Sequence, residues 1–440
     1  ESPDTLYAAS FQRRRTPFGY NGGGPGSALW KTIDGGASWT KLAGGLPADG
    51  DIGRIGVTVF RRDPRVVYAL VEHPKQSGIY RSDDRGETWR KMSDTNPRPS
   101  YYSQVIVDPN NDLRIWVLGA PLYSSEDGGK TFRTDMGQKI HGDYHAFWID
   151  PADSSHMMAG TDGGIHLTYD RGRSWDFVNT VPLAQFYEVH YDMRSPYWVC
   201  GGLQDNGSWC GPSRTLYQQG IGNEEWFRVG GGDGFYAVID PSDPNIVYSE
   251  SQDGNLQRFN LRTNERRVIR PEAPAGEKYR FNWNSPIVIS PHDPRTIYYG
   301  GNRVFVSRDR GETWAVVGAD ISNGASRDDM AILGKPAKDF MSRDDGVVPF
   351  GTATTLAESP LKAGVLWVGT EDGNVQVPRN GGATWSNVTA RIPGVPKGTY
   401  VSRVEPSRTA EGAAYVALDG HRADDYRVYL FFTPDFGQTW

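Results

Sequence analysis

The sequence has few of the features that mark membrane proteins, nucleic-acid-binding proteins or helical proteins. No apolar run approaches the roughly 18 to 20 residues that span a bilayer, and no tract is strongly basic. We therefore expect neither membrane insertion nor nucleic acid as a partner. Long stretches rich in Ala, Leu, Glu and Lys are missing as well. Instead, 53 glycines, 29 prolines and 12% aromatic residues in 440 favour many short strands joined by tight turns.

Cysteine is scarce, since only Cys200 and Cys210 occur. If Val199–Cys200 ends one strand and Trp209–Cys210 begins its hairpin partner, the two sulfurs can meet across the ladder. A disulfide there would fit an oxidising compartment. Two buried free thiols are the alternative that this pattern leaves open.

An internal repeat indicates the fold class. The octapeptide Thr32-Ile-Asp-Gly-Gly-Ala-Ser-Trp39 has the pattern of an Asp box, in which a hydroxyl and a carboxylate cap a tight turn and an aromatic residue follows. Further copies end at Trp89, Phe132, Trp175, Trp314 and Trp440, and a weakened copy containing Pro378 and Asn380 ends at Trp385. We interpret the box aspartates as structural and not catalytic.

Each box follows a second recurring signal, an apolar strand that ends in Asp-Pro and is followed by another strand. Val57–Phe60, Asp63-Pro64 and Val66–Tyr68 are one example. The repeating unit is therefore four antiparallel strands with an Asp box between the third and the fourth, which is a β-propeller blade. The predicted fold is all-β.

The spacing of the boxes predicts nine blade units, of which the first lacks its opening strand and the last stops before its fourth. The spacing of 139 residues from Trp175 to Trp314 leaves room for two blades without boxes. We expect arcs of two adjacent seven-bladed propellers, at 1–180 and 181–440, with an inserted loop at about 318–350. Because open sheet edges are a liability, we also expect further blades outside this sequence.

Three motifs outside the boxes resemble a bacterial family of exported proteins that are labelled sortilin-like (VPS10-like) or BNR/Asp-box "glycosyl hydrolase" proteins. They are Gly202-Leu-Gln-Asp-Asn-Gly-Ser208, the run Phe281–Pro294 and His141-Gly-Asp-Tyr-His145. The resemblance covers essentially the whole chain. It implies export, tandem propellers similar to those of xyloglucanase-type enzymes, and hydrolase chemistry without an assigned catalytic residue. The fold alone does not give the function.

Blade topology places the candidate site on the face opposite the Asp boxes, where turns between second and third strands meet the links between blades. That face is rich in acids, amides and aromatic rings, which suit a sugar. The predicted ligand-binding residues are His141, Tyr144, His145, Asp162, Asp205, Asn206, Trp209, Asp253, Asn282 and Trp283. For each aspartate, an ordinary hairpin turn is the competing interpretation.

Asp143 and Asp233 are the predicted catalytic residues, because they stand at strand entries where turn chemistry requires them less. Such a pair could hydrolyse a glycosidic bond, one acid protonating the leaving oxygen and the other activating water. His141, Asp143 and His145 alternate and so share one face of a strand. The two histidines would lie about 13 Å apart there, too far for one metal ion, so we predict no metal.

These patterns favour an exported recognition scaffold that holds a glycan or peptide on the face opposite the boxes. The alternative is a glycoside hydrolase that cleaves a polysaccharide with a pair of carboxylates in a cleft between propellers, and a structural subunit of an assembly is a third possibility. We expect no cofactor, an extracellular or periplasmic location, and a polysaccharide or peptide ligand, with other protein subunits as further candidate partners.

Overall fold

The structure of the chain, a computed structural model, describes residues 3–180, 184–378 and 384–440. Its regular structure is almost entirely β-strand, which confirms the predicted all-β class. The helical turns in the described part are 3₁₀ turns of three residues: η1 (Asn223–Glu225), η2 (Gln252–Gly254), η3 (Arg327–Asp329), η4 (Ala337–Asp339), η5 (Thr389–Arg391) and η6 (His421–Ala423). Within these described ranges, no helix is long and apolar enough to cross a membrane.

The chain divides into two compact units. Unit 1 comprises Glu1–Arg15, Gly19–Pro182 and Ala331–Gly346. Unit 2 comprises Thr16–Phe18, Leu183–Met330 and Val347–Trp440. Part of the expected insertion at 318–350 therefore packs in unit 1, although the chain before and after it belongs to unit 2. The boundary at residue 180 and the number of blades per propeller remain predictions.

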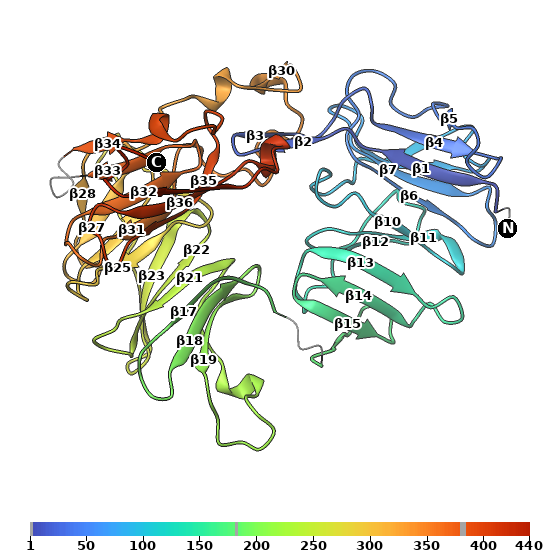
Figure 1. Ribbon diagram of the computed structural model, residues 1–440. Coiled ribbons are helices and arrows are strands. Elements are labelled where there is room, and N and C mark those ends of the chain that lie inside the picture. Colours follow the sequence, from blue (N-terminus) through green and yellow to red (C-terminus); the bar gives the residue numbers. More distant parts are fainter. Residues whose placement is uncertain (1–2, 181–183, 379–383) are drawn as a thin grey trace. The chain divides into compact units, whose positions relative to one another are not determined.

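Unit 1 contains four blade sheets in chain order (Figure 1). Their strands are β1 (Leu6–Ser10), β4 (Ala28–Thr32) and β5 (Thr40–Lys41); β6 (Ile55–Val59), β7 (Val67–Val71), β8 (Gly78–Ser82) and β9 (Arg90–Ser93); β10 (Val105–Asp108), β11 (Asn111–Val117) and β12 (Tyr123–Ser125); and β13 (Tyr144–Ile149), β14 (Met157–Thr161), β15 (Gly164–Thr168) and β16 (Asp176–Phe177). Two-stranded sheets are formed by β2 (Arg14–Thr16) with β3 (Gly19–Asn21), and by β29 (Ala331–Ile332) with β30 (Lys335–Pro336).

Unit 2 contains five blade sheets, again in chain order. Their strands are β17 (Phe186–Tyr191), β18 (Trp198–Leu203), β19 (Gly207–Pro212) and β20 (Phe227–Gly230); β21 (Gly234–Ile239), β22 (Ile246–Ser251), β23 (Asn255–Asn260) and β24 (Glu265–Val268); β25 (Ile287–Ile289), β26 (Ile297–Gly300), β27 (Val304–Ser307) and β28 (Ala315–Val317); β31 (Ala353–Glu358), β32 (Leu366–Thr370), β33 (Val375–Pro378) and β34 (Trp385–Asn387); and β35 (Tyr400–Pro406), β36 (Ala414–Asp419) and β37 (Tyr429–Thr433).

Neighbouring strands of each blade pair antiparallel, in the order in which they follow along the chain. In a four-stranded blade of this topology, the first-to-second and third-to-fourth turns share one face. The second-to-third turns and the links between blades share the other. The hydrophobic cores lie between consecutive sheets, as where Tyr68, Leu70 and Ile79 of one blade pack on Val107 and Ile115 of the next. Central strands such as β7 are buried on both sides for this reason.

The Asp boxes form the hydrogen bonds that their pattern predicts. In the second box the Ser82 hydroxyl donates to Asp84 and accepts from the Gly86 amide at 2.7 Å. The Asp84 carboxylate in turn accepts from the amide and the hydroxyl of Thr88. These bonds hold the pKa of Asp84 down to about 2. The structural interpretation of the box aspartates is thereby confirmed.

The same bonds recur in the boxes of Asp34, Asp127, Asp170, Asp309 and Asp435. The weakened box between Pro378 and Trp385 falls largely on residues 379–383, which lie outside the described residues.

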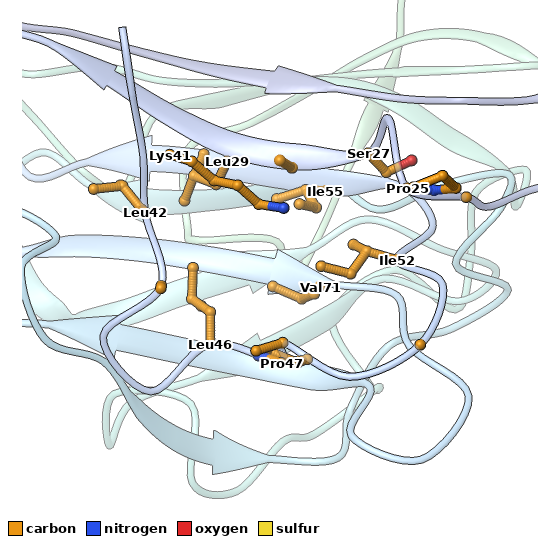
Figure 2. A pocket seen from close by; sticks show the side chains of 15 residues that line it. Pro25, Ser27, Leu29, Lys41, Leu42, Leu46, Pro47, Ile52, Ile55 and Val71 are labelled. Atoms are coloured by element: carbon orange, nitrogen blue, oxygen red, sulfur yellow. The ribbon is translucent and has the colours of Figure 1, made fainter.

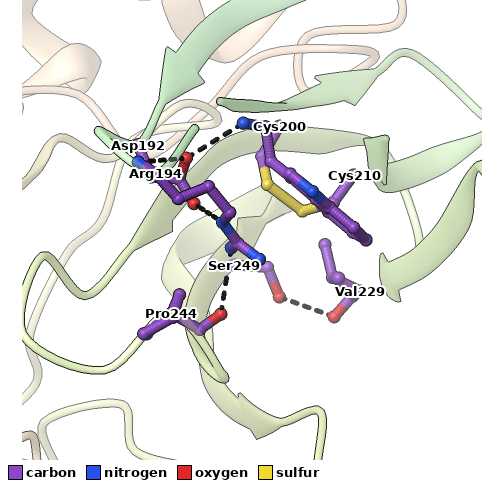
Figure 3. Close-up of a disulfide and its surroundings, with 8 residues drawn as sticks. Asp192, Arg194, Cys200, Cys210, Val229, Pro244 and Ser249 are labelled. Carbon is purple, nitrogen blue, oxygen red and sulfur yellow. Dashed lines mark hydrogen bonds and ion pairs between the residues drawn. A yellow bond between two sulfur atoms is a disulfide. The ribbon is translucent and has the colours of Figure 1, made fainter. Parts of the chain in front are cut away.

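Cys200 and Cys210 are bonded to each other (Figure 3). They are direct partners in the ladder of β18 and β19, so the expected pairing of the two strands is confirmed. The expected strand ends were wrong, since β18 continues past Cys200 to Leu203 and β19 begins at Gly207. Both side chains are buried in the core that this blade shares with the next one. Next to the bridge, Asp192 accepts a hydrogen bond from the Trp198 amide at 2.9 Å and pairs with Arg194, which fixes the turn between β17 and β18.

Candidate functional site

Asp143 lies in unit 1, in the link between β12 and β13, on the face opposite the Asp boxes. Its φ of +58° is in the left-handed region, which non-glycine residues seldom adopt. The Tyr102 hydroxyl donates a hydrogen bond to its carboxylate. Tyr102 comes from the previous link, between β9 and β10, and only 2% of it is exposed. A buried phenol therefore fixes the carboxylate in an unusual backbone position.

Asp162 brings a second carboxylate to the same place from the turn between β14 and β15. One oxygen of Asp162 lies 3.3 Å from Nε2 of His145, which is on β13. A carboxylate oxygen of Asp143 lies within 4.8 Å of one from Asp162. Two ionised carboxylates this close repel each other, so a hydroxyl, a proton or a cation placed between them is favourable.

Aromatic rings lie beside the two carboxylates. The His145 ring stacks on Tyr102, with ring centroids 5.6 Å apart, and meets Tyr101 edge-on at 5.1 Å. The guanidinium of Arg98 lies 4.1 Å above the Tyr101 ring. We name these residues, Arg98, Tyr101, Tyr102, Asp143, His145 and Asp162, the acid–aromatic cluster.

The link that carries the aromatic residues is held in a fixed conformation. The Tyr101 and Tyr102 amides both donate to the Arg98 carbonyl, at 3.0 and 3.1 Å. The Arg54 guanidinium donates to the Tyr101 carbonyl. Arg98 and Ser103 have φ values of +38° and +41°. Strained backbone of this kind persists only where its surroundings enforce it and gathers at functional sites.

The structure thus brings three of the predicted residues of unit 1 together: Asp143, His145 and Asp162. Tyr144 is fully buried in the core, where its hydroxyl donates to the Gly137 carbonyl at 3.2 Å, so it cannot reach a ligand. His141 packs against the Gly163 backbone and supports the turn that carries Asp162. Arg98, Tyr101 and Tyr102 were not predicted. Their one sequence signal is a Tyr-Tyr pair in a link between blades.

In unit 2, Asp233 and Asp205 support a hairpin turn. The Asp233 carboxylate accepts from the Asp205 amide at 2.8 Å, and the Asp233 amide donates to the Gln252 side chain at 2.9 Å. Asp233 is only 7% exposed. Next to this turn, the Tyr187 hydroxyl donates to Gln204 at 2.6 Å. These contacts favour a structural role for Asp233, and its catalytic role remains a prediction.

The other predicted residues of unit 2 are spread over several turns. The Trp209 indole donates to the Asn206 carbonyl at 2.7 Å within one hairpin. Asp253 is exposed in η2. Trp283 packs edge-on against Phe235, with ring centroids 6.4 Å apart. Their proposed contacts with a ligand remain predictions.

In the turn that follows β32, Glu371 contacts Asn282, which is buried. The Asn282 side-chain amide donates to Thr352 at 2.9 Å and to Glu371 at 3.3 Å. Glu371 is 1% exposed, and burial raises its pKa to about 8. Burial also raises the pKa of the adjacent Asp372. Since neither carboxyl reaches solvent, these groups bear on stability and not on ligand binding.

Unit 1 also contains an apolar cavity of about 250 Å³ between its first and second blades (Figure 2). Leu29, Leu42, Leu46, Ile52 and Ile55 are among the side chains that line it. Its lining side chains are mostly apolar and include neither an acid nor an aromatic ring, in contrast to the acid–aromatic cluster. The acid–aromatic cluster is therefore the candidate site.

Comparisons with known proteins find carbohydrate-active relatives. The BNR/Asp-box repeat model matches residues 80–91. An oligoxyloglucan-reducing end-specific xyloglucanase from Emericella nidulans is 24% identical over 211 residues, which are 46% of this chain and 23% of that protein. A xyloglucanase from Hypocrea jecorina is 29% identical over 151 residues, 30% of this chain and 18% of that protein. The matched segments thus span less than a quarter of the length of these relatives.

Among solved structures, the GH74 xyloglucanase from Xanthomonas campestris aligns with 96% of this chain and 75% of its own, at 16% identity and a TM-score of 0.38. The GH74 enzyme of Niastella koreensis aligns with 97% of this chain and 74% of its own, at 13% identity and the same TM-score.

Proposed function

We propose that this chain is part of a glycoside hydrolase that acts on a xyloglucan-like polysaccharide, and that the acid–aromatic cluster is its reactive site. The observation that carries the proposal is the pair Asp143 and Asp162, whose carboxylate oxygens approach within 4.8 Å beside three aromatic rings. The names of the two xyloglucanases to which the chain is similar support the substrate class.

Glycoside hydrolysis needs one carboxylate that stabilises or attacks the anomeric carbon and one group that protonates the leaving oxygen. Carboxyl groups about 5–5.5 Å apart suit retention of configuration, and wider pairs suit inversion. The Asp143–Asp162 spacing is closer to the first case. We assign Asp143, which accepts the Tyr102 hydrogen bond, the role of the charged carboxylate. We assign to Asp162, which contacts His145, the donation of a proton to the leaving oxygen.

The aromatic residues would hold the sugar. Sugar rings present C–H groups that pack on aromatic surfaces, and their hydroxyls donate to carboxylates. The His145 side chain is 34% exposed and the Asp162 side chain is 19% exposed, so both reach the surface. Arg98, with 45% of its side chain exposed, adds N–H donors for hydroxyl oxygens.

Binding without cleavage is the second candidate, and one specific observation favours it. The Tyr102 hydroxyl donates to Asp143, and Asp162 lies 3.3 Å from Nε2 of His145, so both carboxyl groups are held as hydrogen-bond acceptors. Ionised carboxylates accept hydrogen bonds from sugar hydroxyls but do not donate protons. On this hypothesis the chain is a recognition scaffold for a glycan or a peptide. Its likeness to sortilin-like proteins remains a prediction.

The proposal includes export to an oxidising compartment. Its support is the Cys200–Cys210 disulfide, since such bonds persist outside the reducing cytosol.

The test incubates the protein with xyloglucan, other β-glucans and a bacterial polysaccharide while new reducing ends are counted. Asp143→Asn and Asp162→Asn are compared with wild type and with Asp94→Asn, a control at a side chain that is 92% exposed. Release that both cluster variants lose and the control keeps would support the hydrolase.

Binding without release, lost in the same two variants, would instead support recognition. Wild-type activity in both Asp143→Asn and Asp162→Asn would overturn the assignment of the site.

A further inference from the structure

We propose that Asp345, which lies in the insertion between β28 and β31, is a positioning residue for the candidate site and makes its polysaccharide binding depend on that insertion. The proposal deepens the function proposed above and rests on it. It assigns Asp345 the task of orienting Arg98 and, through Arg98, Tyr101.

The insertion is anchored in unit 1 through its backbone. Residues Ala331–Gly346 belong to that unit. The Tyr20 amide donates to the Arg343 carbonyl at 3.2 Å, and the Gly22 amide donates to the Met341 carbonyl at 2.9 Å. Each bond joins the insertion to the chain at or just after β3. The segment therefore packs as an ordered part of unit 1.

Side chains add further anchors on both sides of η4. Before it, Lys335 pairs with Asp51. After it, the Ser342 hydroxyl donates to the buried carboxyl of Glu72 at 2.9 Å. Phe340, which is 8% exposed, packs against Gly19, where a side chain would come within 3.1 Å of the ring. These contacts fix the segment up to the residues just before Asp345.

Asp345 bridges two residues of the link that carries Tyr101 and Tyr102. One carboxylate oxygen accepts from Nε of Arg98 at 2.7 Å, and the other accepts from the Ser100 hydroxyl. Its side chain is 19% exposed, whereas that of Arg98 is 45% exposed. A charge-assisted bond on each side of Pro99 opposes rotation of the link and of the Arg98 side chain.

A continuous series of contacts joins Arg98 to the carboxylates of the candidate site. The guanidinium lies over Tyr101 at 4.1 Å, and the Tyr101 ring meets those of Tyr102 and His145 at 4.9 and 5.1 Å. Tyr102 donates to Asp143. The positions of the Tyr102 and His145 rings therefore depend on where Tyr101 lies. Asp345 in turn limits the positions that Arg98 can take above Tyr101.

The position of Arg98 should affect how tightly a polysaccharide binds. Asp345 uses Nε of Arg98, which leaves the terminal guanidinium nitrogens to donate to sugar hydroxyls. Without Asp345, Arg98 would sample other rotamers, and binding would have to pay the entropy of fixing it. The carboxyl groups of Asp143 and Asp162 would be unchanged. The loss should thus appear in substrate affinity and not in turnover.

Asp345→Asn is the test, and the adjacent Asp344→Asn is its matched control, since the Asp344 side chain is 72% exposed and lies next in sequence. With the polysaccharide that wild type cleaves or binds, we expect Asp345→Asn to raise KM or Kd about tenfold and to change kcat less than twofold. Asp345→Glu keeps the carboxylate and should retain most of the wild-type affinity. Arg98→Lys should lose affinity, because a lysine cannot donate to Asp345 and cover Tyr101 at once.

Hydrogen exchange of the peptide that spans residues 94–104 is a second readout that needs no ligand. We expect faster exchange there in Asp345→Asn and in Ser100→Ala, and wild-type exchange in Asp344→Asn. Unchanged affinity together with unchanged exchange in Asp345→Asn would overturn the positioning role. A fall in kcat at unchanged KM would overturn it as well.

The two readouts separate the failure of this inference from failure of the proposed function. If wild type neither binds nor cleaves any polysaccharide, the proposed function fails, and exchange at 94–104 alone decides whether Asp345 holds the link. If wild type acts on a polysaccharide and Asp345→Asn behaves like Asp344→Asn in both readouts, only the positioning role fails.

Discussion

The hydroxyl of Tyr102 donates a hydrogen bond to the carboxylate of Asp143 across 41 residues of chain, joining the links that precede the third and fourth blades of unit 1. Tyr102 is almost completely buried and Asp143 has a left-handed backbone, so neither side chain can move far without disturbing the other. This pair joins the fold to the proposed chemistry, because the blade-to-blade packing that buries Tyr102 also orients Asp143.

Replacement of Tyr102 by phenylalanine keeps the ring and removes the donor. A hydrogen bond to a charged group is worth about 1.5–3 kcal/mol, so we expect kcat/KM for polysaccharide to fall at least about tenfold. Tyr7→Phe is the control, since it removes a hydroxyl that donates to the Arg85 carbonyl elsewhere in unit 1. Equal activity of the two variants would show that the Tyr102 hydroxyl does not serve Asp143 in the reaction.

An Asp box should stabilise its blade and do nothing for activity. Asp84→Asn weakens the bonds to Ser82 and Thr88, and we expect a loss of about 1–2 kcal/mol in the free energy of unfolding by urea. Because the pKa of Asp84 is held at about 2, this stabilisation is present above its ordinary pKa of 3.8 and disappears as the pH falls toward 2. The difference between wild type and variant should therefore shrink between pH 4 and pH 2, while polysaccharide turnover at neutral pH stays unchanged.

The local parts of this fold could be predicted from the sequence because their interactions span only a few residues. A box joins a hydroxyl, a carboxylate and an amide within four positions, as Ser82, Asp84 and Gly86 do. The first blade was expected to lack its opening strand, and in agreement β1 pairs with β4, the strand that precedes the box. The cysteine hairpin followed from the same local logic.

The candidate site could be predicted only in part. Asp143 and Asp162 flank Tyr144 and Thr161, which are partners in the β13–β14 ladder, so the pairing of two neighbouring strands brings these aspartates together. The Tyr102–Asp143 bond depends instead on how the third and fourth blades pack. Asp345 is 247 residues from Arg98, and no local pattern indicates that an insertion between β28 and β31 packs in unit 1. The periodicity of a sequence does not indicate where an irregular segment packs when its partners are far away along the chain.

The Cys200–Cys210 disulfide should be present in the exported protein and should stabilise it modestly. Chain-entropy estimates for a loop of about ten residues give roughly 2–3 kcal/mol, so the double variant Cys200→Ser/Cys210→Ser should lose about that much in urea unfolding. In wild type unfolded without a reducing agent, iodoacetamide should label neither cysteine. Labelling of both would contradict the bond and remove the support for an oxidising compartment.

Unit 2 should lose stability as the pH rises through the range in which Glu371 ionises. Burial raises the pKa of this carboxyl from 4.5 to about 8, so the folded state holds its proton more tightly than the unfolded chain does. The stabilisation is complete below about pH 4.5 and is lost progressively as the pH approaches 8. At about 1.4 kcal/mol per pKa unit the loss amounts to roughly 5 kcal/mol.

The neighbouring Asp372, whose pKa burial also raises, acts in the same direction. The effect is measured as the urea stability of the protein at pH 5, 7 and 9, with hydrogen exchange of β32 as the probe of this blade. Glu371→Gln should flatten the pH dependence, because glutamine keeps an acceptor for Thr352 but carries no proton to lose. A variant as sensitive to pH as wild type would show that the Glu371 carboxyl does not control the stability of this blade.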